Sequence, residues 1–292
     1  MDQLLASGAS TGDVIWHSHP DVWLLMGGLI LGYIWLMARV GPKVVPAGET
    51  VVTTRQKVLF FTGVAIMWFG ADWPMHDLSE NYLFSFHMFQ HMLFTLVAPG
   101  LLLAGIPRWL FRIILKPPVL LKAARILTRP LVALILFNVL VAVTHWPTMV
   151  NASVGSEPLH FFLHLILVTS ALIMWFPVIA PLPELPRLSD PGKMLYLFGQ
   201  SILPTVPASF LTFADSPIYS SYASFPRLWG ISAVSDQMTA GLIMKIGGGL
   251  LLWSVIAVIF FKWYAKEEAS ESETLSWDDF ERGLEAWDLR RT

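Results

Sequence analysis

The chain of 292 residues is too apolar for a water-soluble protein: 55% of it is hydrophobic, 14% is charged and the mean hydropathy is +0.60. An ordinary soluble domain carries nearly twice that share of charge. The net charge of −2 says little by itself, and no nucleic-acid partner is expected. With no cysteine, disulfides and thiolate metal sites are excluded, so any metal must be held by His, Met, carboxylate or backbone groups.

The apolar residues come in blocks of about twenty, the length that crosses a bilayer as a helix. The pattern predicts an all-α integral membrane protein with a seven-transmembrane bundle over residues 21–263, following an outer segment at 1–20. The segment has no basic stretch typical of a signal peptide, so we expect the first span to be retained. The predicted spans are residues 21–39, 56–73, 83–104, 130–147, 158–180, 193–213 and 234–263.

The positions of the basic residues predict the orientation. Of the 19 lysines and arginines, 17 lie on one side of the predicted spans, Arg227 lies on the other and Lys245 lies within the last span. Positive charge accumulates on the cytoplasmic side. We therefore expect the N-terminus outside, the C-terminus in the cytoplasm, and the whole chain in a bacterial plasma membrane.

Three connecting segments carry further expectations. The inner loop around Trp109 is basic and aromatic, which is typical of a segment lying along the membrane surface. The aromatic outer loop 214–233 is expected to form a lid. The cytoplasmic acidic tail, residues 264–292, contains a helix start at Ser276 with Asp279 and apolar residues at helical spacing; this short amphipathic helix either docks on protein or frays in solvent.

Histidines gather in the outer half of the predicted bundle. Two pairs with four-residue spacing enter from outside, His87 with His91 and His160 with His164, and each pair lies on one helix face. His76 and His145 lie at the outer ends of neighbouring spans, while His17 and His19 are expected to be solvated. Buried polar side chains need partners or ligands in lipid. The pattern predicts one outward-facing pocket.

The residue types suit a metal. Imidazole with thioether from Met88, Met92 or Met238 suits copper, particularly Cu(I), although imidazole alone also suits zinc or iron. Asp72 and Asp236 can act as ligands or orient a histidine. Each has a simpler interpretation as well: methionine fills gaps in cores, Asp236 can cap the last helix, and a lone membrane histidine such as His145 often only bonds a neighbouring helix.

Three stretches resemble one family, the caa3-type cytochrome c oxidase assembly factors (CtaG of Gram-positive and related bacteria). They are Phe86-His87-Met88-Phe89-Gln90-His91-Met92, Leu159-His160-Phe161-Phe162-Leu163-His164, and Trp229-Gly230-Ile231-Ser232 with Asp236-Gln237-Met238-Thr239-Ala240-Gly241. The similarity runs over roughly residues 20 to 262, and the chain departs from the expected aromatic residue at Lys245. The resemblance implies a role in making haem–copper oxidase, with delivery of copper to subunit I, and it carries over to His87, His91, His160, His164 and Asp236-Gln237.

We therefore expect a non-catalytic assembly factor that binds Cu(I) reversibly and contacts oxidase subunit I, the lipid bilayer and an outer copper donor protein. Three alternatives stay open. A haem-binding cytochrome is disfavoured because histidines one turn apart cannot ligate opposite faces of one haem. A copper transporter needs an inner path, where only Lys245, Asn138, Gln200 and Ser201 are polar. A zinc or iron enzyme lacks an evident nucleophile–base pair.

Overall fold

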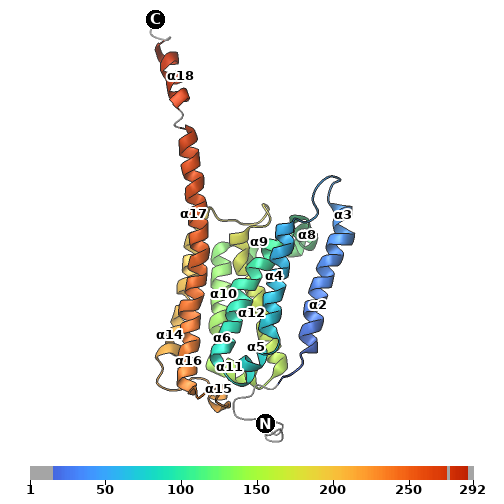
Figure 1. Cartoon of the computed structure of the whole chain (residues 1–292), viewed down its shortest axis with the longest axis vertical. Helices are drawn as coiled ribbons and strands as arrows, with labels where there is room; N and C mark the ends of the chain where they lie inside the picture. Colours follow the sequence, from blue (N-terminus) through green and yellow to red (C-terminus); the bar gives the residue numbers. More distant parts are fainter. Residues whose placement is uncertain (1–15, 275–276, 289–292) are drawn as a thin grey trace.

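The computed structural model describes residues 16–274 and 277–288, and every regular element within them is helical (Figure 1). The first half of the chain contains α2 (Pro20–Trp35), η1 (Leu36–Val40), α3 (Gly41–Val44), α4 (Thr54–Ala71), α5 (Met75–Asn81), α6 (Phe84–Met92), η2 (Leu93–Val97), α7 (Ala98–Gly105), α8 (Arg108–Ile114), α9 (Pro118–Leu127) and α10 (Pro130–Thr144). The second half contains α11 (Pro147–Val154), α12 (Glu157–Ile179), α13 (Asp190–Ile202), α14 (Thr205–Phe213), α15 (Ser220–Ser224), α16 (Ala233–Leu242), η3 (Ile243–Gly247), α17 (Gly248–Thr274) and α18 (Trp277–Asp288). The three η elements are π-helical turns inside longer helices.

Five helices are long and apolar enough to cross a membrane: Pro20–Val44, Phe84–Gly105, Glu157–Ile179, Asp190–Phe213 and Ala233–Ala269. The second and fourth predicted spans qualify only together with bent neighbours, α4 with α5 at 42° and α9 with α10 at 79°. The chain is therefore a helical membrane protein with five to seven spans. The predicted count of seven stays a prediction.

The helix starts follow from local sequence. Thr53 and Gln56 form a capping box at the start of α4, because each side chain bonds the backbone N–H of the other. Ser189 and Ser232 cap α13 and α16 in the simpler manner. Several other helices begin at proline, which has no N–H to leave unpaired in the first turn.

Small residues set the closest helix crossings. A Cβ on Gly105 would lie 2.5 Å from the backbone nitrogen of Phe60, so α7 and α4 touch through their backbones. At the crossing of α16 and α14, a Cβ on Gly241 would lie 2.9 Å from the carbonyl oxygen of Ala208. Such approaches are typical of membrane helices, where packing replaces the hydrophobic effect as the force between helices.

Pro99 and the π turn η2 interrupt the hydrogen bonding of the third span. Because Pro99 has no N–H, the carbonyl oxygen of Thr95 is free of its helical partner. The indole Nε1 of Trp175, on α12, donates to this oxygen at 3.1 Å. The interruption thus ties the α6–α7 span to α12 in the main apolar core.

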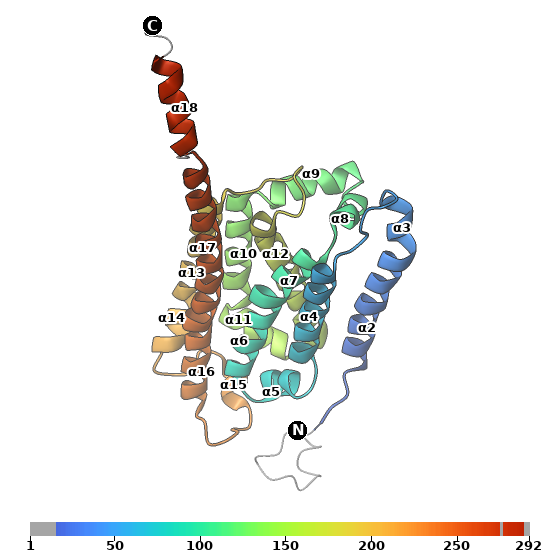
Figure 2. The same ribbon diagram turned by 45° about the horizontal axis from the view of Figure 1, so that its top comes forward.

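The two ends of the bundle differ. Helices α3, α8 and α9, which carry Lys43, Arg108 and Arg125 among other basic residues, lie at one end (Figure 1). The short helices α5, α11 and α15 lie at the other end, as the tilted view of Figure 2 also shows. The sequence predicts that this second end faces outside; we call it the α5 end.

The tail leaves the bundle as a continuous helix. α17 extends past the other helices at the end opposite α5, and α18 follows it (Figure 1). The expected tail helix is therefore present as α18, while the start predicted at Ser276 lies outside the described residues.

Candidate metal centre

Helix α6 carries the first pair of histidines on its buried face. Its start is held from another helix: the carboxylate of Asp236, on α16, accepts hydrogen bonds from the backbone N–H groups of Phe84 at 2.8 Å and Ser85 at 3.0 Å. These are two of the donors that a helix leaves unpaired at its first turn. His87 and His91 follow at one-turn spacing, and both side chains are buried.

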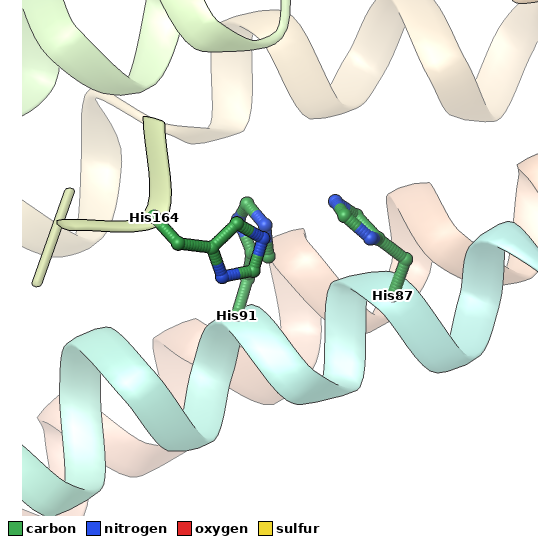
Figure 3. A group of neighbouring side chains, drawn as sticks. All are labelled: His87, His91 and His164. Atoms are coloured by element: carbon green, nitrogen blue, oxygen red, sulfur yellow. The ribbon is translucent and has the colours of Figure 1, made fainter. Parts of the chain in front are cut away.

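Helices α12 and α10 complete the group. His160 and His164 lie one turn apart on α12, and His145 follows the last residue of α10. Figure 3 shows His164 reaching across toward the rings of His87 and His91 on α6. We call His87, His91, His145, His160 and His164 the histidine cluster.

The cluster is compact. Ring centroids lie 4.3 Å apart for His87 and His91, 4.4 Å for His160 and His164, and 4.9 Å for His91 and His164. His87 also lies 5.8 Å from His160 and 5.7 Å from His164, and His145 lies 5.4 Å from His91. The structure therefore brings both predicted pairs and His145 into one pocket.

Ring nitrogens in this pocket lack hydrogen-bond partners. Both nitrogens of His91 and the Nε2 atoms of His160 and His164 are buried without a protein donor or acceptor in hydrogen-bonding geometry. Unpaired buried nitrogen is costly, and most buried polar groups are paired. Nitrogens converging in this way provide the donor set of a metal site.

His145 is oriented by its own helix. Its Nδ1 lies 2.7 Å from the carbonyl oxygen of Val141, so Nδ1 must carry the proton and donate. This leaves Nε2 as the basic nitrogen. Metal-binding histidines usually donate their other ring N–H to a carbonyl or carboxylate oxygen in this way.

Glu80, at the end of α5, is the site residue that sequence reasoning missed. Its Oε1 lies 3.1 Å from Nδ1 of His87 and 3.2 Å from Nε2 of His160, although the second contact is misaligned for a hydrogen bond. One feature of the sequence could have indicated Glu80: it comes four residues after His76, on a helix at the α5 end.

The donor atoms form two overlapping groups. His87, His91 and His164 offer ligand atoms within 4.8 Å of one another, and so do Glu80, His160 and His164. The first group is all nitrogen, whereas the second adds one anionic oxygen. His164 belongs to both, and because a neutral imidazole has one basic nitrogen, the arrangement fits one ion at a time.

The loop 214–232 closes the pocket from the α5 end. The Tyr222 side chain lines the pocket and its hydroxyl donates to the carbonyl oxygen of Ser79 at 3.0 Å. Burial raises the pKa of Tyr222 well above its ordinary value, so the phenol stays protonated. The Tyr219 hydroxyl donates to the carbonyl oxygen of His145 at 2.8 Å. The loop thus covers the cluster in the position expected of a lid.

Three residues that the sequence suggested as metal ligands, Asp72, Asp236 and His76, contact other groups. Asp72 accepts hydrogen bonds from the indoles of Trp23 and Trp68 at 2.8 and 2.9 Å, and Asp236 caps α6. His76 Nδ1 lies 3.3 Å from the amide nitrogen of Gln90. Neither aspartate belongs to a group of three clustered ligand atoms among the described residues.

The three candidate methionines lie at different places in the structure. Met88 lines the pocket, whereas Met92 lies deeper and Met238 is 43% exposed.

His17 and His19 were expected to be solvated, but they lie 2.6 and 3.0 Å from the carboxylate of Asp77.

Lys245 points away from the cluster. Its Nζ lies 3.4 Å from the hydroxyl of Ser209 and 5.3 Å from the ring centroid of Phe213, both on α14. The charge therefore lies beside α14, and Lys245 lines neither cavity next to the histidines.

A polytopic helical membrane protein with buried, converging imidazoles is the class that this fold and pocket define. The family model of the cytochrome c oxidase caa3 assembly factor (Caa3_CtaG) matches residues 31–266, which is most of the chain. The chain belongs to this family. No curated protein and no solved structure matched it.

Proposed function

We propose that the protein, as a member of a cytochrome c oxidase assembly factor family, binds copper as Cu(I) in the histidine cluster and passes it to oxidase subunit I. Family membership supports the oxidase connection. The pocket would face the outside of a bacterial plasma membrane, where an outer copper donor protein would load it. The role is binding and release, with no catalytic step.

The observation that carries this proposal is the set of buried ring nitrogens at His91 and His164 that have no hydrogen-bond partner. Imidazole nitrogen is a good ligand for copper, and the nearby thioether of Met88 makes the surroundings softer. Glu80 adds a negative charge that would offset the charge of the ion inside the membrane.

Reversible binding suits the two overlapping donor groups. Because His164 can serve either group, an ion can exchange one set of ligands for the other without leaving the pocket. A site meant for release should hold its ion less rigidly than a permanent four-ligand site does.

Copper retention by the purified protein tests the proposal. Wild type, a His87→Ala/His164→Ala variant and a His17→Ala/His19→Ala variant would be loaded with Cu(I) under anaerobic reducing conditions and desalted. The last variant is the matched control, because it removes two imidazoles that bond Asp77 outside the cluster. Copper should be lost from the first variant and kept by the control. Equal copper in all three proteins contradicts the proposal.

The oxidase itself provides the second test. After deletion of the gene, the isolated oxidase should contain haem but lack copper. An oxidase with both metals in place, or one lacking haem as well, contradicts delivery of copper by this protein.

The haem alternative is disfavoured by the packing of the rings. His91 and His164 meet edge to face, with an interplanar angle of 86° and centroids 4.9 Å apart. Two rings in such contact leave no room for a flat macrocycle between them. A Soret band in the purified protein would reverse this conclusion.

A further inference from the structure

A second chamber lies next to the pocket and deeper along the spans. It is enclosed by α6 and η2, α10, α13 and the η3–α17 segment. Three thioether side chains line it, those of Met88, Met92 and Met244. His91 and His145 line both this chamber and the pocket of the histidine cluster, so they form the boundary between the two.

His91 has two ring nitrogens without partners and lines both cavities. Both its Nδ1 and its Nε2 are buried without partners. The two nitrogens of an imidazole point in different directions, so one ion cannot occupy both. The group with His87 and His164 uses one ligand atom of His91, which leaves the other nitrogen for a different partner.

The remaining polar groups of the chamber are already engaged. The amide oxygen of Gln200 accepts from Asn138 at 2.6 Å, and the Gln200 amide nitrogen donates to the Tyr196 hydroxyl at 3.1 Å. The Ser201 hydroxyl donates to the carbonyl oxygen of Phe198. The donors left to a ligand are therefore sulfur and imidazole nitrogen.

The lining carries no carboxylate or lysine among the described residues, in contrast to the pocket beside Glu80. Thioether and imidazole without an anionic group favour a soft monovalent ion over a divalent one. The sulfur positions are also defined by packing: Met244 is 5% exposed, and a Cβ on Gly248 would lie only 3.2 Å from Sδ of Met92.

We propose that this chamber is a second, softer coordination site for Cu(I), formed by Met92, Met244 and the second ring nitrogen of His91. The inference rests on the proposed copper-binding function and adds a deeper position to it. A neutral imidazole has one basic nitrogen, so an ion on one side of His91 requires the proton on the other. The two positions are therefore filled alternately, with the ring proton moving to the nitrogen that the ion leaves.

X-ray absorption at the copper edge tests the deeper site on the full-length protein loaded with Cu(I). The variant is Met92→Leu/Met244→Leu, which conserves side-chain volume. Met238→Leu is the matched control, since this methionine is exposed and lines neither cavity. Wild type and control should show sulfur beside nitrogen in the copper shell, and the double variant should show nitrogen alone.

Selenomethionine-labelled wild type shows without a substitution whether a methionine is bound, since copper in the deeper site should have a selenium neighbour, and the double variant then identifies which methionines supply it. Bound copper without sulfur or selenium in wild type overturns the deeper site and leaves the proposed function standing. Sulfur retained in the double variant also overturns the assignment to Met92 and Met244, because Met88, which lines both cavities, is then the sulfur ligand. Absence of copper from wild type overturns the proposed function itself.

Discussion

Glu80 gives the histidine cluster a negative charge that the imidazoles alone lack. A carboxylate bonded to a metal-binding histidine fixes the tautomer of the ring and raises its basicity. Here Oε1 approaches both His87 and His160, one on each of the two helices that carry the histidine pairs. This single side chain therefore joins the two walls of the pocket.

We expect Glu80→Gln to weaken Cu(I) binding by about 10- to 100-fold, the usual effect of losing a carboxylate that supports a metal ligand. The amide keeps the shape of the side chain but removes its charge. Competition with a Cu(I) chelator would measure the affinity. Glu184→Gln is the control, because Glu184 is an exposed carboxylate that bonds Arg112 far from the pocket. Backbone hydrogen bonding, and Arg112 as well, lower its pKa. If Glu80→Gln binds Cu(I) as tightly as wild type does, Glu80 does not contribute to the site.

At the scale of the helix, Asp236 determines where α6 begins. Its two oxygens pair buried N–H groups of the first turn, and its charge complements the positive end of the helix dipole. Three residues after Phe84 comes His87, so the same contact positions the first histidine of the cluster. Asp236 thus acts through the backbone of α6 in this structure.

Substitution of Asp236 should therefore lower the thermal stability of the protein more than it lowers copper binding. Each buried N–H left without a partner costs about 1–3 kcal/mol. We expect Asp236→Ala to melt at a clearly lower temperature and Asp236→Asn to fall between it and wild type. The exposed Asp215→Asn serves as control. If Asp236→Asn instead loses copper with its melting temperature intact, the carboxylate is a ligand rather than a cap.

The α4–α7 crossing depends on the absence of a side chain at Gly105. We expect Gly105→Ala to be destabilising by about 1–3 kcal/mol, the usual effect of overpacking, because its Cβ would collide with the backbone of Phe60. Gly28→Ala makes the same change in α2, where nothing lies within 4 Å, and should be neutral or slightly stabilising. Thermal unfolding in detergent would compare the two, and equal effects would contradict the close crossing.

At the scale of the whole molecule, the chain separates its histidines from its basic loops. The cluster lies near the α5 end, since Glu80 of α5 contacts His87 and His160. The helices α3, α8 and α9, which carry basic residues, lie at the opposite end (Figure 2). An assembly factor with this polarity would present its metal pocket to the outside.

Cysteine labelling would test that orientation on a clean background, since the chain has no cysteine of its own. Asp215→Cys, in the loop over the cluster, should react with a membrane-impermeant thiol reagent on intact cells. Glu49→Cys, in the loop before α4, should react only after permeabilisation. The reverse pattern would place the pocket on the cytoplasmic side and contradict delivery from outside.

The class of protein and the histidine pairs on α6 and α12 could be predicted from helix period and apolar length, which are local properties. The resemblance to the assembly-factor family rests on three short stretches of sequence. His145 was also predicted to belong to the pocket, because its position at the end of a predicted span limits the depth at which it can lie. The sequence did not reveal that α4 and α5 qualify as a span only as a bent pair, or that η2 and η3 interrupt two spans.

Which polar groups meet depends on tertiary packing. The 42° bend between α4 and α5 accompanies the contact of Glu80 with the cluster, while Asp72 is bonded to two indoles and Asp236 caps a neighbouring helix. The division into two chambers at His91 is likewise a matter of packing. The reason is physical: helical spacing determines the face on which a residue lies, whereas crossing angles and bends determine what that face meets.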